Sequence, residues 1–358
     1  MAGYEYANAR LHAMKGRLLR RDDYRALAET PGLERLLAAL SHTPYREAIE
    51  STLIRVSLLE ALNHALSADL CATVGQVRRF FDPPQGRALA LALQHYDIHN
   101  LKALLRGLQN RAPLAEIRAA QLPIGDLSEA VLAELARAAD VRSAIDLLAS
   151  LRLPQASPLL AVRAVHPGAQ LPELELALDR WYFAQALAAA REGPAETALL
   201  RDALALEADL VNLLTVIRLA AFPAERSLYL QRYRVGSPRE LLVSPGRLPL
   251  TVLDEAAAQT SLVAAAQVLA GTPYGEPLAA GLEAFRRSGR LSDVERHLRR
   301  YRLRWRAGLV ARDPLGIGVA LGYLALKVNE VENLRRVIYG VSAGLAPGAI
   351  LDDLEFAA

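Results

Sequence analysis

The sequence predicts an all-helical protein built from three homologous domains, and three observations support this. Ala, Leu, Arg and Glu, which favour helices, dominate its 358 residues, whereas β-branched runs are scarce. A polar motif occurs three times at nearly constant intervals. Apolar residues recur at helical spacing, as at Val294, Leu298, Tyr301, Trp305 and Leu309. Three similar helical domains can close around a central axis with pseudo-threefold symmetry.

The repeated motif has the form acid-x-x-Asn-Leu-x-x-aliphatic-aliphatic, and Arg follows in two of its three copies. The copies are residues 97–106 (DIHNLKALLR), 209–218 (DLVNLLTVIR) and 330–339 (EVENLRRVIY). Their first residues lie 112 and 121 positions apart. This spacing predicts helical domains at residues 1–110, 111–222 and 223–358.

Two further sequence patterns recur in the same order as this motif. The pattern L-E-x-x-L-x-x-W at 174–181 matches V-E-x-x-L-x-x-Y at 294–301, an offset of 120 residues. Thr-Pro-Tyr occurs at 43–45 and again at 272–274, and Ser157-Pro158 is a weaker middle copy. Three markers in the same order make chance a poor explanation for the repeat.

The acid and the Asn of each motif lie three residues apart and therefore share one helix face. Asn is mildly unfavourable inside a helix, so its presence in all three copies indicates a role. One interpretation is a side-chain hydrogen bond that locks a helix to its neighbour; the alternative is a polar cluster that faces a partner. The residues concerned are Asp97, Asn100, Arg106, Asp209, Asn212, Arg218, Glu330 and Asn333.

Three local patterns predict how the C-terminal part is built. Asp313-Pro314 has the form of an N-cap followed by Pro at the first helical position, which predicts the start of a long final helix. The spacing of Gly316, Gly318 and Gly322 differs from a dinucleotide fingerprint and instead indicates close helix packing. The charge-free stretch 256–275 contains Gln, Ser and Pro and is interpreted as an Ala-rich buried helix.

The charge balance is mildly basic, with a net charge of +3. Lys occurs only at 15, 102 and 327, so 39 of the 42 basic residues are Arg. GC-rich coding explains this bias, as does selection for Arg side chains that bind acidic partners. The single Cys71 excludes an intrachain disulfide framework and indicates a reducing compartment. Charges throughout the first 20 residues predict that no signal peptide is present.

The sequence contains no recognisable catalytic motif. A phosphate-binding loop with a Lys after a Gly-rich turn does not occur. His95 and His99 have a spacing that can hold zinc, but the Glu of the H-E-x-x-H pattern does not lie between them. Hydrogen-bonded His residues are the preferred interpretation. We therefore expect no catalytic residues, no metal and no cofactor.

Residues 296–306 (RHLRRYRLRWR) interleave basic and aromatic side chains. Such a stretch can bind nucleic acid through phosphate contacts and stacking, so an Arg-rich helical nucleic-acid-binding module is an alternative function. The favoured interpretation places Tyr301 and Trp305 in the apolar stripe, because Trp181 occupies the equivalent position in the middle copy. The Arg residues then face outward, toward an acidic protein surface or lipid head groups.

The whole chain resembles the C subunit of the prokaryotic V/A-type ATPases, the counterpart of the eukaryotic d subunit. The resemblance is carried by residues 4–11 (YEYANARL), 15–19 (KGRLL), 96–106 (YDIHNLKALLR), 313–318 (DPLGIG) and 330–336 (EVENLRR). These stretches are spread over the chain in the order that the family has.

The resemblance implies an all-helical, pseudo-threefold funnel on the cytoplasmic mouth of the membrane rotor ring of proteolipid subunits. The D and F axle subunits insert into the funnel, and the protein transmits torque between ATP hydrolysis or synthesis and ion translocation. It is then a non-catalytic, peripheral protein at the cytoplasmic face of a prokaryotic plasma membrane. The stator membrane subunit and lipid head groups are further candidate partners, and nucleic acid is not expected.

Overall fold

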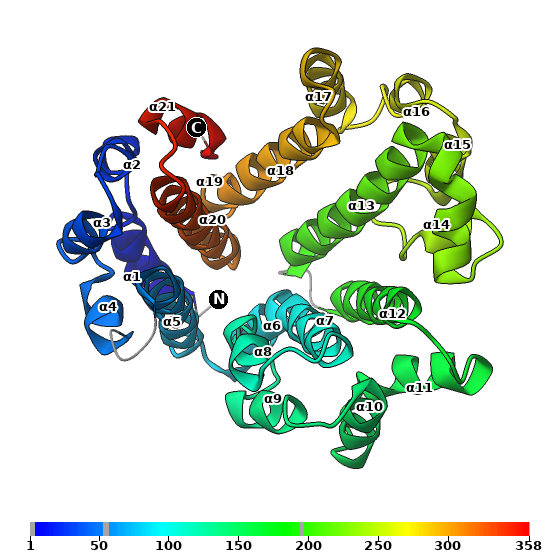
Figure 1. Cartoon of the computed structure of the whole chain (residues 1–358), viewed down its shortest axis with the longest axis horizontal. Helices are drawn as coiled ribbons and strands as arrows, with labels where there is room; N and C mark the ends of the chain where they lie inside the picture. Colours follow the sequence, from blue (N-terminus) through cyan, green and yellow to red (C-terminus); the bar gives the residue numbers. More distant parts are fainter. Residues whose placement is uncertain (1–3, 53–56, 194–196, 358) are drawn as a thin grey trace. The chain divides into compact units, whose positions relative to one another are not determined.

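The computed structural model describes residues 4–52, 57–193 and 197–357. Throughout these residues every regular element is a helix and no strand occurs, so the all-helical prediction is confirmed (Figure 1). The chain forms two compact units: unit 1 contains residues 1–90 and 303–358, and unit 2 contains residues 91–302. No helix in the described part of the chain has both the length and the apolar character needed to cross a bilayer.

Unit 1 is organised around α20 (Gly318–Ser342). Fifteen of its 25 residues are buried, so α20 is enclosed by other helices on most sides. It packs against α1, α2, α3, α5, α19 and α21. The helices around it are α1 (Glu5–Lys15), α2 (Arg21–Ala28), α3 (Leu33–Leu40), α4 (Arg46–Thr52), α5 (Leu58–Arg78), the larger part of α6 (Pro83–Leu93), the last residues of α18 (Leu291–Ala307), α19 (Leu309–Arg312) and α21 (Pro347–Asp353).

Unit 2 is organised around α13 (Ala198–Ala221), which packs against α12, α15 and α16. Fourteen of its 24 residues are buried. A second long helix, α12 (Leu171–Glu192), packs on both α7 (His95–Gln109) and α13. The remaining elements are α8 (Leu114–Ala119), α9 (Glu129–Leu135), α10 (Val141–Ser150), α11 (Ala156–Val165), η2 (Pro223–Glu225), α14 (Arg226–Tyr233), η3 (Pro238–Leu241), α15 (Leu250–Ala258), α16 (Leu262–Val268), α17 (Gly275–Ser288) and most of α18.

The predicted start of the final long helix is wrong by four residues. The helix begins at Gly318 rather than at Pro314, and residues 314–317 form a turn. The Asp313 carboxylate still caps the helix, because it accepts a hydrogen bond of 2.8 Å from the Gly318 N–H. Glycine is required at this turn, since a Cβ at Gly318 would lie 2.6 Å from the Asp313 Cβ and 2.7 Å from the Leu309 carbonyl oxygen.

The charge-free stretch 256–275 is also corrected, because it spans parts of three helices instead of one. Helix α15 ends at Ala258 and α16 begins at Leu262. Ser261 caps α16 by accepting a hydrogen bond of 3.2 Å from the Ala264 N–H. A capping hydroxyl that satisfies a free N–H of the next helix favours this break.

The glycines predicted to allow close packing do so where α19 meets α20. A Cβ at Gly322 would lie 2.5 Å from a methyl carbon of Val310 and 3.1 Å from the Arg306 carbonyl oxygen. These separations are shorter than van der Waals contact, so the two helices can approach this closely only at a residue without a side chain.

We expect Gly322→Ala to lower the free energy of unfolding by about 1–3 kcal/mol, because overpacking forces the two helices apart. Urea unfolding followed by circular dichroism measures this loss. Gly168→Ala is the matched control, since a Cβ at Gly168 would meet nothing within 4 Å. An equal effect of the two substitutions would contradict the close-packing role.

Candidate functional site

The three motif Asn side chains are completely buried, and each one pairs with the backbone of a single residue. In each pair the side-chain amide donates to a carbonyl oxygen and the side-chain oxygen accepts from the N–H of the same residue. The donor–acceptor distances lie between 2.7 and 3.4 Å. Asn100 holds Leu122, Asn212 holds Val243, and Asn333 holds Glu355.

The motif acids hold a second stretch of backbone next to the first. Asp97 accepts hydrogen bonds of 2.9 Å from the N–H groups of residues 126 and 127. Asp209 accepts from the N–H groups of residues 246, 247 and 248 at 2.9–3.2 Å. We call each acid and Asn, together with the backbone they hold, a clamp, and name the clamps after α7, α13 and α20.

The α7 and α13 clamps each hold one continuous loop, residues 122–127 and 243–248 respectively. Both loops pass so close to the acid that glycine is needed there. A Cβ at Gly125 would lie 2.1 Å from an Asp97 carboxylate oxygen, and one at Gly246 would lie 2.7 Å from an Asp209 oxygen.

The α20 clamp holds two segments that are far apart in the sequence. Glu330 accepts from the Leu19 N–H at 2.5 Å, whereas Asn333 holds Glu355. Asn329 adds a hydrogen bond of 2.8 Å to the Glu355 carbonyl oxygen. One helix therefore ties the segment after α1 to the segment after α21.

The Thr-Pro-Tyr elements belong to the same clamps. The Tyr45 hydroxyl donates to Glu330 at 2.6 Å, and the Tyr274 hydroxyl donates to Asp209 at 2.8 Å. Both rings are fully buried. Burial, followed by the charge of the neighbouring carboxylate, raises the pKa of both phenols well above the usual range, so both hydroxyls remain donors.

The weak middle copy at Ser157-Pro158 is misplaced. The turn that precedes α11 ends at Pro154-Gln155, and the Ala156 N–H bonds to the Leu153 carbonyl oxygen. The turns before α4 and α17 have the same bond, from residue 46 to 43 and from residue 275 to 272. Gln155 therefore stands where the other two copies have Tyr, which explains why the sequence pattern pointed to the wrong Pro.

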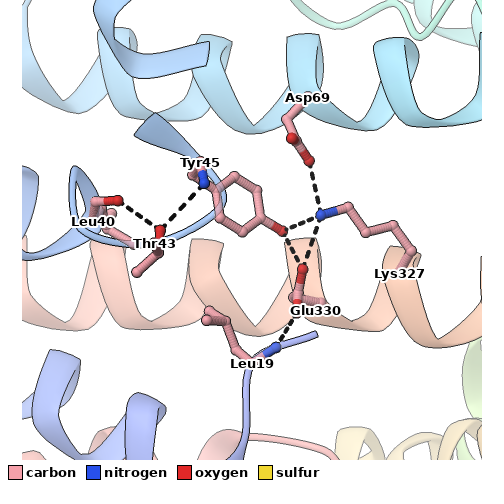
Figure 2. A network of polar contacts seen from close by, with 7 residues as sticks. All are labelled: Leu19, Leu40, Thr43, Tyr45, Asp69, Lys327 and Glu330. Carbon is pink, nitrogen blue, oxygen red and sulfur yellow. Dashed lines mark hydrogen bonds and ion pairs between the residues drawn. The ribbon is translucent and has the colours of Figure 1, made fainter. Parts of the chain in front are cut away.

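A buried lysine completes the α20 clamp (Figure 2). Lys327 lies one turn before Glu330, and its Nζ is 2.9 Å from both the Tyr45 hydroxyl and the Glu330 carboxylate. The same Nζ is 2.8 Å from a carboxylate oxygen of Asp69 on α5. Burial raises the pKa of Asp69, and the Lys327 charge opposes that rise. The sequence shows only that Lys327 is one of three lysines and that it follows an apolar stretch of nine residues, 318–326.

The motif Arg residues contact side chains of other helices, whereas the acid and the Asn hold backbone groups. Arg106 on α7 forms a two-pronged ion pair with Glu175 on α12, at 2.6 and 2.7 Å. Arg218 on α13 pairs with Glu295 on α18 at 2.9 Å. In both pairs, the Arg of the repeated Asn motif thus contacts the Glu of the second repeated pattern, which lies on another long helix. Tyr339, which replaces Arg in the third copy, is exposed.

The basic stretch 296–306 forms part of α18, with its aromatic residues half-buried. The Tyr301 ring packs edge-on against the Tyr274 ring, with ring centres 5.4 Å apart. Arg302 lies 3.5 Å from Glu207, and the Arg312 guanidinium lies 4.5 Å from the centre of the Trp305 ring. These contacts favour the interpretation of a packed stripe over an open stacking surface.

His95, the first residue of the candidate zinc pair, makes local contacts. His95 Nδ1 lies 2.9 Å from the Ala92 carbonyl oxygen, and its ring packs on Tyr96. Within the residues that the structure describes, no group of three or more His, Cys, Asp or Glu side chains could hold a metal ion. The motif acids and Asn residues are held by buried hydrogen bonds, and the motif Arg residues form exposed ion pairs.

Comparison with known proteins identifies the family. The family model described as ATP synthase (C/AC39) subunit matches residues 7–352. This chain belongs to that family. The match spans all three clamp motifs and agrees with the resemblance that the sequence motifs carry.

Curated relatives of the ATP synthase (C/AC39) subunit family align over nearly the full chain. The C subunit of the A-type ATP synthase of Methanosarcina acetivorans is 28% identical over 356 residues, which covers 99% of this chain and 93% of the relative. The protein of the same name from Halobacterium salinarum is 28% identical and covers 99% and 97%. That from Pyrococcus abyssi is 26% identical and covers 97% and 89%.

We expect Asn212→Ala to lower the free energy of unfolding by about 2–4 kcal/mol, because it leaves the buried N–H and C=O of Val243 unpaired, at about 1–3 kcal/mol each. Urea unfolding measures the loss, and limited proteolysis should show faster cleavage within residues 243–248. Thr215→Ala on the same helix is the control, since its hydroxyl donates to the Val211 carbonyl oxygen of that same helix. Similar losses for the two variants would rule out the clamp.

The Asp209 carboxyl predicts a pH dependence of stability. Burial raises its pKa above the usual 3.8, although hydrogen bonds from Arg247 and Tyr274 oppose the rise. A raised carboxyl pKa means that the folded state binds the proton more tightly than the unfolded state does. The stabilisation is therefore complete below the unfolded pKa and is lost as the pH rises through the folded pKa.

We accordingly expect Asp209→Asn to destabilise the protein more at about pH 4 than at about pH 7, because Asn cannot bind the stabilising proton. Urea unfolding of the wild-type protein and the variant at both pH values gives the comparison. A larger loss at the higher pH would show that the folded-state pKa is lowered instead.

Proposed function

We propose that this chain is the C subunit of an A-type ATP synthase and acts as a non-catalytic rotor adaptor. It joins the D and F axle subunits to the membrane proteolipid ring and transmits torque between ATP hydrolysis or synthesis and ion translocation. It works as a peripheral protein at the cytoplasmic face of the plasma membrane. Family membership and the names of its relatives support this assignment.

The observation that best supports an adaptor is the cyclic order of the clamps. With domain boundaries at residues 110 and 222, the α7 clamp of the first domain holds Leu122 in the second. The α13 clamp of the second domain holds Val243 in the third. Glu330 in the third domain holds Leu19 in the first. This order is consistent with three homologous domains related by a pseudo-threefold axis, and it supports the proposed funnel.

Torque transfer also requires stiffness at the junctions between domains. Each clamp is buried and combines charged acceptors with backbone donors, and such hydrogen bonds are stronger than those between neutral groups. Close packing of Leu and Ala around the clamp helices adds low compressibility. A junction built in this way resists local opening when one side is turned against the other.

The proposal predicts that a complex reconstituted without this chain still hydrolyses ATP in its soluble head but pumps no ions. Adding the wild-type chain should restore ATP-driven ion pumping, measured with a fluorescent dye in proteoliposomes. The triple variant with Asn100→Ala, Asn212→Ala and Asn333→Ala should restore less pumping per ATP hydrolysed, and Thr215→Ala should match the wild type. ATP hydrolysis by the isolated chain, or full pumping without it, would refute the adaptor role.

A further inference from the structure

A cavity of about 520 Å³ lies in unit 1 beside the α20 clamp. Both clamping side chains, Glu330 and Asn333, line this cavity. The held segments also line it, at Leu19 and at Phe356. Its size falls within the range of about 300–1,000 Å³ that is typical of binding pockets.

At the other two clamps, the chain itself connects the two backbone sites that the acid and the Asn hold. Residues 123–125 connect the two backbone sites of the α7 clamp, and Ile124 among them is buried. Residues 244–245 make the same connection at the α13 clamp. At the α20 clamp, the two sites belong to separate segments, which no short loop joins.

The opening of the cavity is basic. His12, Lys15 and Arg20 line it and are exposed, and the Arg21 guanidinium lies 4.7 Å from the centre of the Phe356 ring. Among the described lining residues the one acid is Glu330, which already accepts hydrogen bonds from the Leu19 N–H and the Tyr45 hydroxyl. This arrangement attracts a negatively charged occupant.

We propose that the cavity binds an extended acidic segment of a partner polypeptide. The segment follows the path that residues 123–125 take across the α7 clamp and places an apolar side chain against Leu18 and Leu326. Its carboxylate faces Lys15 and Arg20. This binding site lies on the isolated chain and goes beyond the proposed coupling role.

Two heptapeptides from the chain's own sequence provide matched probes. One copies residues 121–127 (QLPIGDL), which crosses the α7 clamp and carries one acid; the other copies residues 242–248 (LVSPGRL), which crosses the α13 clamp and carries one base. Both are acetylated, amidated and given a photoreactive benzophenone side chain at the fourth position. After irradiation with the full chain, mass spectrometry locates the crosslinks.

We expect the acidic peptide to crosslink to residues 12–24, 326–333 or 354–357, at least about fivefold more efficiently than the basic peptide. The double variant with Lys15→Glu and Arg20→Glu should abolish this preference. Arg35→Glu, at an exposed position of unit 1 outside the cavity, should retain it.

Three outcomes would overturn the proposal. Equal labelling by the two peptides would exclude selection by charge, and labelling elsewhere would exclude the cavity. Loss of the crosslink on adding inorganic phosphate or vesicles of anionic lipid would assign the opening to small anions or to a membrane surface. The wild-type chain alone decides between these outcomes, so neither a misfolded variant nor a failure of the coupling experiment affects the result.

Discussion

The pairing of a buried Asn side chain with one peptide group is the constraint on which the two units depend. An amide side chain offers a donor and an acceptor in the same geometry as a backbone peptide, so one Asn can satisfy both polar groups of a loop residue. Without that partner, the loop backbone would enter the core with unpaired groups, which is costly. Non-helical backbone can therefore cross α7, α13 and α20 with its polar groups paired.

The buried acid of each clamp needs hydrogen-bond donors around its carboxylate. The number of backbone donors differs between the clamps. Within the described residues, Asp209 accepts from three backbone N–H groups and the Tyr274 hydroxyl. Glu330 accepts from only one backbone N–H, because the backbone at its clamp comes from separate segments. Lys327 donates a further hydrogen bond to Glu330, and its own charge is paired with Asp69. A buried charge that is paired and hydrogen-bonded is tolerated, whereas an unpaired one is not.

Sequence periodicity was sufficient to find the elements that meet, but not the way in which they meet. The acid and Asn were placed on one face, and the repeated Glu at 175 and 295 proved to be the partner of the repeated Arg. The held loops were not found, because they contribute mainly backbone atoms. The one signal that they share is Gly followed two residues later by Leu, at 125 and 127 in one loop and at 246 and 248 in the other. The Lys327–Asp69 pair joins helices that are far apart in the chain, and no local pattern signals it. The helix start predicted from Asp313 was wrong, because a capping side chain can accept from a helix N–H across a turn of several residues.

The two kinds of repeated contact differ in how firmly they hold. The Arg106 side chain is 58% exposed in its ion pair with Glu175, and ion pairs of exposed side chains contribute on the order of 0.2–1 kcal/mol and are screened by salt. The acid and Asn side chains of the clamps are almost completely buried, and breaking one clamp leaves several polar groups unpaired at the same time. A twisting force on the chain, as the proposed function would apply, would therefore open the Arg–Glu contacts before the clamps. The Arg–Glu pairs then set how the long helices align, whereas the clamps fix the backbone segments that cross them. Stiffness around the clamp helices therefore follows from burial rather than from the number of surface charges.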